Sequence, residues 1–353
     1  MENKDDYAWK IILWLILFLV FGIIIIACKP AVREFVMTVN GPEPPGKMGI
    51  TLEHEHILVD FIGADSTGYF RWNRDSVISK IIPVILQAKE NGLKTFIDCT
   101  PSYLGRDPWL LKELSRKTGM IFITNTGFYG SGKNKYVPKS FFEEDTETAA
   151  RKWIAEFENG IEGSGVKPGF IKIAVENDSV ISPEHRKIVT VAGLTHLKTG
   201  MVIASHTGPE HLAFGQIEIL KGLGIDPSAF IWVHAQRGTM QGLIDAAKRG
   251  TWVSLDNIRN RPNLEPGASY SVDWYADRIA EMKNQGLLEK VLISHDSGWY
   301  DPAKTGGGNI SGYTDIFDYL IPALKERGFT QSDIDQVLIT NPAEAFKIKI
   351  RPL

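Results

Sequence analysis

Eight short apolar segments alternate with amphipathic segments along most of the chain, and this alternation constrains the fold more than any other feature. The apolar segments lie at 49–53, 95–99, 120–124, 170–173, 201–205, 230–233, 252–255 and 291–294. Short continuous apolar runs are typical of parallel strands covered on both faces. Segments with a helical period lie between them, at 76–91, 144–160, 183–199, 239–250 and 272–286. The pattern predicts an α/β fold, a (β/α)8 (TIM) barrel over residues 49–353.

The overall composition is that of an ordinary α/β enzyme. Lys and Arg total 39 against 42 Asp and Glu, so there is no basic footprint and we expect no nucleic-acid partner. The two cysteines, Cys28 and Cys99, give no CxxC metal spacing and no disulfide framework. Residues 29–48 are expected to be a linker and lead-in segment, because they end in a turn-rich run of Gly and Pro.

The N-terminus carries an uninterrupted apolar run at 11–27. This run is slightly shorter than the roughly 20 residues that span a bilayer. It ends in a sequence that resembles a bacterial lipoprotein cleavage box, which predicts that residues 1–28 are a signal peptide and that Cys28 carries lipid. Signal peptides usually begin with a net positive flank, but residues 1–10 carry no net positive charge. An uncleaved membrane anchor and a buried helix are therefore the alternatives. The two membrane interpretations place the domain on a membrane, facing the periplasm or the cell exterior.

Metal-ligating side chains gather at the carboxyl ends of the predicted strands, where barrel enzymes place their active sites. His54 and His56 end the first strand, and their spacing of two lets both point to one face and share an ion. His206, His234 and Asp296 end the fifth, sixth and eighth strands. Each of these residues alone is more often a packing or capping residue. Together, at one end of four strands, they predict a metal site.

Lys172 interrupts the apolar fourth strand. A buried ammonium group is costly unless it is paired, and it would repel a nearby cation. One interpretation is a salt bridge to Glu176. The other is that Lys172 reacts with carbon dioxide to give an N6-carboxylated side chain, an anion that can bridge two cations. The remaining histidines are expected to be structural or surface residues: His185, His196, His211 and His295.

The order of these ligands resembles that of the phosphotriesterase family of the amidohydrolase superfamily. The stretches at 49–56, 322–329 and 341–346 are also similar to that family, and the resemblance covers roughly residues 35–348. It implies a metal-dependent hydrolase with a binuclear metal centre.

By this resemblance, His54, His56 and Asp296 hold the more buried ion, and His206 and His234 hold the more exposed one. Carboxylated Lys172 bridges the two divalent ions. Imidazole and carboxylate-type ligands favour Zn²⁺, although Mn²⁺, Fe²⁺ and Co²⁺ also fit. The implied mechanism uses a metal-bridging hydroxide as nucleophile, and Asp296 accepts its proton.

The loops leave the cleaved bond open among ester, lactone, amide and phosphoester. Tyr129 resembles the tyrosine that lactonase-type relatives direct at the metals; it either assists catalysis or only lines the pocket. The loop after His234 lacks the aspartate usual in triesterases and lactonases, and Arg259 does not directly follow Asp256. These departures argue against quorum-signal lactonase activity and efficient organophosphate hydrolysis.

Five cations are expected in the loops at the barrel mouth: Lys133, Lys135, Arg237, Arg259 and Arg261. Either they are ordinary solvated charges, or they steer a small anionic substrate towards the metals, with Arg259 as a substrate contact. The glycine-rich segment at 305–309 is a candidate lid. The alternative function is a membrane-attached binding or scaffold barrel without turnover. The sequence leaves the substrate, the metal and the oligomeric state open, a homodimer included.

Overall fold

In the computed structural model, which describes residues 34–265 and 267–353, the strands form a parallel barrel. The barrel positions are β3 (Thr51–Leu58), β4 (Thr95–Asp98), β5 with β6 (Ile121–Ile123 and Asn125–Thr126), β7 (Phe170–Ala174), β8 (Ile203–His206), β9 (Phe230–Val233), β10 (Trp252–Leu255) and β11 (Val291–Ile293). Parallel ladders run from β3 to β5 and from β6 to β11. Thr124 joins β5 to β6, and β11 lies beside β3, so the eight positions close on themselves.

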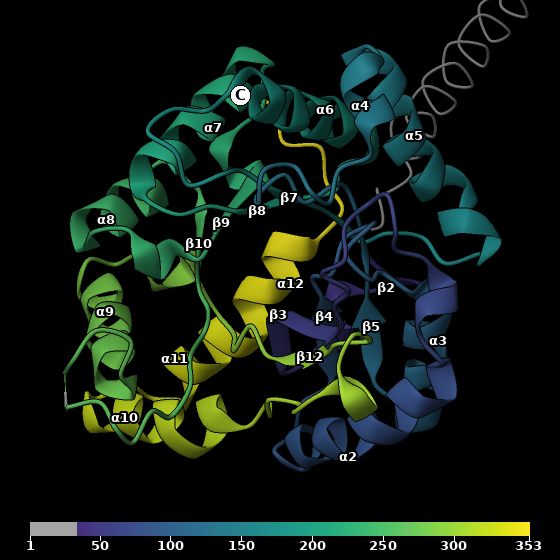
Figure 1. Cartoon of the computed structure of the whole chain (residues 1–353). Coiled ribbons are helices and arrows are strands. Elements are labelled where there is room, and N and C mark those ends of the chain that lie inside the picture. The colour runs from purple at the N-terminus through teal and green to yellow at the C-terminus, as the bar shows by residue number, and fades with distance from the viewer. Residues whose placement is uncertain (1–33, 266) are drawn as a thin grey trace, which may run out of the picture. The chain divides into compact units, whose positions relative to one another are not determined.

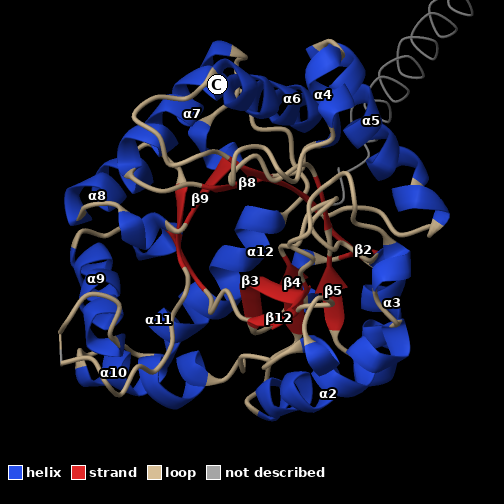
Figure 2. Ribbon diagram, in the orientation of Figure 1, coloured by secondary structure: helices blue, strands red, loops and turns tan. Residues whose placement is uncertain are grey.

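Helices surround the strands as an outer ring, as Figures 1 and 2 show. They are α2 (Arg74–Glu90), α3 (Pro108–Thr118), α4 (Lys139–Glu143), α5 (Thr146–Asn159), α6 (Pro183–Thr199), α7 (Glu210–Gly222), α8 (Met240–Lys248), α9 (Val272–Asn284), α10 (Ile321–Glu326) and α11 (Gln331–Asp335). The last helix, α12 (Asn341–Phe346), lies within this ring. Side chains on the inner helix faces and the outer strand faces form one large apolar core. The fold predicted from the alternating pattern is confirmed.

Three local features differ from the sequence prediction. The expected linker contains an antiparallel hairpin of β1 (Val36–Thr38) and β2 (Gly41–Glu43). The pattern did not single out α3 or α7 as helices. The first barrel strand extends to Leu58, well beyond the predicted end, because His54 and His56 continue the extended backbone instead of ending it.

The two ends of the barrel interior differ in polarity. At the amino ends of the strands, an apolar cluster includes Phe170, Trp252 and Phe346. The rings of Phe170 and Phe346 are 5.2 Å apart, so α12 packs against this end. Histidine, lysine and carboxylate side chains occupy the opposite, carboxyl end, as expected for a barrel enzyme.

The predicted signal peptide or membrane anchor at residues 1–28 lies outside the described residues. Across residues 34–265 and 267–353, no helix is both long and apolar enough to span a bilayer.

Candidate metal centre

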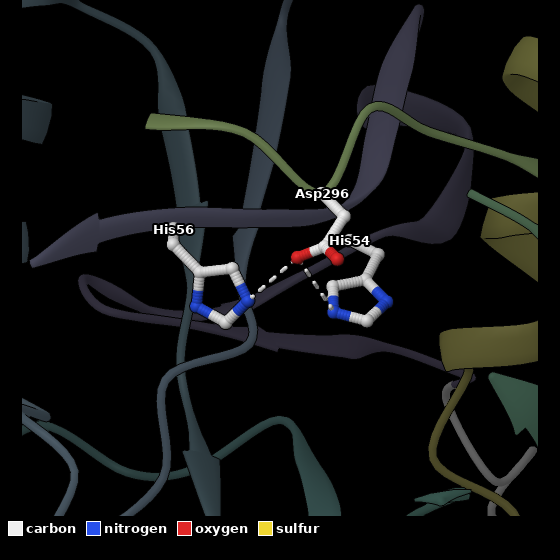
Figure 3. Close-up of side chains that lie close together, drawn as sticks. All are labelled: His54, His56 and Asp296. Atoms are coloured by element: carbon white, nitrogen blue, oxygen red, sulfur yellow. Dashed lines mark ion pairs between the residues drawn. The ribbon is translucent and has the colours of Figure 1, made fainter. Parts of the chain in front are cut away.

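His54 and His56 both reach the interior from β3, and a register shift between Leu52 and Glu55 accommodates them. His56 Nε2 lies 3.2 Å from Asp296 Oδ1, and His54 Nε2 lies 3.8 Å from the same oxygen (Figure 3). The other nitrogen of His56, Nδ1, is 2.7 Å from Thr100 Oγ1, which fixes the ring. These three side chains therefore converge on one position at the barrel mouth, as predicted.

Asp256, which directly follows β10, joins two of the predicted ligands. One carboxylate oxygen, Oδ2, is 3.3 Å from His54 Nδ1 and accepts a 2.9 Å hydrogen bond from the backbone N–H of His234. The other oxygen, Oδ1, is hydrogen-bonded to His234 Nδ1. Asp256 was not among the predicted ligands. Its position at a strand end, like that of Asp296, was the available signal.

His206, the last residue of β8, faces His234 across the site. Its Nδ1 is 2.6 Å from His234 Nε2 and 3.0 Å from the Tyr129 hydroxyl. Tyr129 is therefore at the centre, in contact with a predicted ligand. The structure brings together all six predicted metal ligands and the tyrosine.

Lys172 lies inside the barrel on β7 and is 1% exposed. Its Nζ has no hydrogen-bond partner among the described residues, although it lines the same cavity as the histidines. The alternative salt bridge with Glu176 is absent from the described contacts. Glu176 instead accepts hydrogen bonds from Ser131 Oγ and the backbone N–H of Lys133. Burying a charged amine without a partner costs free energy. An anionic group that would compensate the Lys172 amine is therefore missing among the described residues at this position.

The protonation of the site suits cation binding. Burial and the nearby Lys172 lower the pKa of His54 to about 4, and burial with the neighbouring His234 lowers that of His206 well below 6.5. Burial alone would raise the pKa of Asp296, but the hydrogen bond from His56 and the proximity of His54 hold it below its usual range. The site thus offers neutral imidazoles and an ionised carboxylate, which are the ligand forms that divalent metals require.

The backbone is strained where three neighbouring strands end. His234, Asn257 and Asp296 have φ angles of 63°, 62° and 52°, in the left-handed region that non-glycine residues rarely adopt. Such conformations cost roughly 1–3 kcal/mol each and cluster at functional sites. His234 and Asp296, which both have this left-handed backbone conformation, direct their side chains into the site.

A cavity of about 130 Å³ opens above these residues. On one side it is lined by Val59, Leu104 and the stacked rings of Phe61 and Trp299, whose centroids are 5.6 Å apart. Trp299 also lies 5.1 Å from the His56 ring and donates from Nε1 to the Asp296 carbonyl. These residues give the cavity an apolar wall that the sequence analysis did not identify.

Of the five expected rim cations, only Arg237 is among the described residues that line this cavity. Arg259 donates to the backbone carbonyl of Asp296, and Arg261 donates to Asn257 and Tyr270. Lys135 Nζ donates to the Phe61 carbonyl. These three cations therefore brace the loops, and Arg259 lies behind a predicted ligand instead of facing the cavity.

The predicted lid does not line the cavity either. Asp301 N–H donates to the Gly307 carbonyl, and a Cβ at Gly307 would lie 2.2 Å from the Tyr300 ring. The glycine-rich turn is therefore packed and hydrogen-bonded, and it contacts α2.

A larger cavity, of about 230 Å³, is lined by Tyr69, Trp72 and Arg106. Arg106 is already paired with Glu156 and Glu162, at 2.7 and 3.2 Å. None of the described groups of residues that could hold a metal ion lies there, so the smaller cavity is the functional candidate.

The donor set at the smaller cavity fits divalent cations. Ligand atoms of His54, His56 and Asp296 lie within 4.8 Å of one another, as do those of His54, His234 and Asp256. Imidazole and carboxylate donors in this arrangement suit Zn²⁺ and similar ions.

Comparison with known proteins agrees with this geometry. A family model described as the phosphotriesterase family matches residues 34–346. A phosphotriesterase homology protein from Escherichia coli is 27% identical over 303 residues, covering 85% of this chain and 98% of the relative. An aryldialkylphosphatase from Saccharolobus solfataricus is 26% identical, covering 85% and 95%. An N-acetyltaurine hydrolase from Xenopus tropicalis is 25% identical, covering 89% and 98%.

Proposed function

The chain belongs to the phosphotriesterase family and is a metal-dependent hydrolase, and from this premise we propose that it cleaves an amide or ester in a small substrate that carries an anionic group. The relatives that hydrolyse N-acetyltaurine support this proposal, because that compound is a short acyl amide with a sulfonate. The relative that is an aryldialkylphosphatase is evidence that the family fold also accommodates phosphoesters, so the bond must be tested directly.

The position of Arg237 carries the proposal. Apart from Lys172, Arg237 is the one Lys or Arg among the described cavity-lining residues. A guanidinium group binds carboxylate, sulfonate or phosphate through paired hydrogen bonds. A substrate whose scissile bond lies at the histidines can therefore place an anionic group against Arg237. The small cavity favours a compact molecule.

We further propose that the centre holds two divalent cations, with Zn²⁺ favoured. His54, His56 and Asp296 would hold one, and His206 and His234 the other. The buried, unpartnered Nζ of Lys172 supports carboxylation of this side chain, since that change replaces an uncompensated cation with an anion between the two positions. Bound cations would polarise the scissile carbonyl and lower the pKa of water.

The remaining steps belong to side chains of this chain. Asp296 is ionised and can accept the proton of the attacking water. The Tyr129 hydroxyl lies beside His206 and can donate to the substrate carbonyl oxygen, which gains negative charge during attack. The apolar wall of Phe61 and Trp299 keeps water away from the opposite side of the bound molecule.

A hydrolysis screen of the purified full chain tests the proposal. It compares N-acetyltaurine and N-acetyl amino acids with neutral amides, esters, lactones and phosphotriesters. Arg237→Gln should raise KM for anionic substrates about tenfold or more, because a hydrogen bond to a charged group contributes roughly 1.5–3 kcal/mol. KM for neutral substrates should change little. Arg249→Gln, which alters an arginine outside the cavity, is the matched control.

Neutral compounds as the best substrates, with selectivity unchanged in Arg237→Gln, would exclude the anionic class while leaving the metal-dependent hydrolase intact. The alternative of a membrane-attached binding or scaffold barrel predicts bound metal without hydrolysis of any compound in the screen.

A further inference from the structure

Glu53 is a fully buried carboxyl group inside the barrel, one residue before His54 on β3, and none of the steps above uses it. Its Oε1 lies 2.5 Å from Ser254 Oγ on β10. Since β11 separates β3 from β10 in the barrel, this contact reaches past the neighbouring strand through the interior. Glu53 keeps it in either protonation state, because a hydroxyl group can donate to a carboxylate and accept from an acid.

The hydrogen-bonded chain continues from Ser254 to the metal centre. Ser254 Oγ is also 3.1 Å from Asp256 Oδ2, the oxygen that lies 3.3 Å from His54 Nδ1. The second oxygen of Asp256 is bonded to His234 Nδ1. Glu53, Ser254 and Asp256 are each no more than 1% exposed, so water does not compete for these contacts.

Two carboxyl groups thus share one serine hydroxyl. A hydroxyl has a single proton, so its direction decides which hydrogen bonds are left for Asp256 to make. Removing Glu53 would free Ser254 to rotate and would leave a gap inside the barrel. Groups that hold metal-ligating histidines in this way commonly change metal affinity when they are replaced.

We propose that Glu53 is a positioning residue for the metal centre, acting through Ser254 on Asp256 and through Asp256 on the rings of His54 and His234. The inference rests on the proposed metal-dependent function. It differs from a packing role in one measurable way: the effect of replacing Glu53 must depend on the presence of the Ser254 hydroxyl.

The experiment is a double-mutant cycle on the full chain with Glu53→Leu, Ser254→Ala and the combined variant. Zn²⁺ and Co²⁺ affinity and stoichiometry are measured by titration, and the Co²⁺ absorption spectrum reports ligand geometry. Glu53→Leu should weaken binding about 10- to 100-fold, as replacement of groups behind metal ligands typically does. The combined variant should bind no more weakly than Ser254→Ala alone. Glu53→Gln, whose amide can still contact the hydroxyl, should retain most of the affinity.

Cys99→Ala is the control, because Cys99 is buried in the same interior and its Sγ contacts the backbone carbonyl of Glu53, while no described contact joins it to Ser254 or Asp256. It should leave metal affinity unchanged. If Glu53→Leu does not fold, the cycle is run with Glu53→Ala, which also removes the carboxyl group. A loss of affinity in Glu53→Ala that disappears in the Ser254→Ala background supports the inference, and an equal loss in both backgrounds overturns it.

Wild-type affinity in Glu53→Leu, or effects of the two substitutions that simply multiply, would overturn the inference while the metal-dependent function stands. A wild-type chain that binds no divalent cation would overturn both.

Discussion

Nε2 of His234 lies 2.6 Å from Nδ1 of His206. Two imidazole nitrogens at this distance must share a proton or a cation, since two facing lone pairs repel. Burial and the proximity of His234 lower the pKa of His206 well below its ordinary value, which disfavours a charged pair and leaves a neutral N–H···N hydrogen bond or a shared cation. A common cation would satisfy both nitrogens with a modest separation of the rings.

We therefore expect His206→Asn to lose one of two bound cations. The metal content of the purified chain should fall from about two to about one per chain, because His54, His56 and Asp296 remain to hold the other. Elemental analysis after extensive dialysis measures this. His211→Asn, which changes an exposed histidine that is not among the residues lining the cavity, should keep the wild-type content. An unchanged metal content in His206→Asn would show that His206 is not a ligand.

Lys172→Ala should lose metal and activity together, because it removes the anion proposed to lie between the two cations. Short carboxylic acids such as formate or acetate should partly restore both by standing in for the missing group. Lys248→Ala at the end of α8 is the surface control. Full metal content and activity in Lys172→Ala would contradict carboxylation. Incorporation of ¹³C-labelled bicarbonate into the wild-type side chain, followed by NMR, provides an independent measurement.

The barrel, and the convergence of the candidate ligands at one end of it, could be predicted because both depend on local pattern. Strand-length apolar runs predict strands, and the fold itself brings the strand ends together. Lys172 was recognisable because a lone charge in an apolar strand needs an explanation. Glu53 is the same kind of signal, but it stands beside a histidine motif and was taken as part of it. A charge inside a strand should be considered separately from the motif it borders.

The direction of loop side chains could not be predicted. Arg259 was expected at the rim, yet it donates to the backbone of Asp296. Its loop begins at Asn257, whose positive φ turns the chain in a way that spacing alone does not reveal. The contact between His54 and Asp256 joins residues about two hundred positions apart, and only the closed barrel places them together.

The membrane attachment proposed from residues 11–28 is testable without structural information. If Cys28 is lipidated, Cys28→Ala should block processing and labelling with a fatty-acid analogue, and the apolar run should stay on the chain. Mass spectrometry of the N-terminus and fractionation of cells report these outcomes. Cys99→Ala is the matched cysteine control. Identical processing and labelling of wild type and Cys28→Ala would exclude the lipoprotein proposal and favour an uncleaved anchor.

Acid should destabilise the chain through His196, a fully buried residue near the end of α6 that is not among the residues lining the metal cavity. Its Nδ1 is 2.8 Å from the Met201 carbonyl, and its Nε2 accepts a hydrogen bond from the backbone N–H of Arg351, so the ring must be neutral to make both contacts. Burial lowers its pKa from 6.5 to about 4. Between these two values the unfolded state binds more protons than the folded state, so stability falls as pH drops through this window, by up to about 1.4 kcal/mol per pH unit. Above pH 6.5 this residue adds no pH dependence.

His196→Asn cannot titrate, so its free energy of unfolding should fall less steeply than that of wild type between pH 6.5 and 4. The variant starts roughly 1–3 kcal/mol less stable, because it loses the hydrogen bond to Arg351. Denaturant titrations at several pH values measure the slopes, with the exposed His211→Asn as control. Parallel slopes for His196→Asn and wild type would show that another group causes the acid sensitivity.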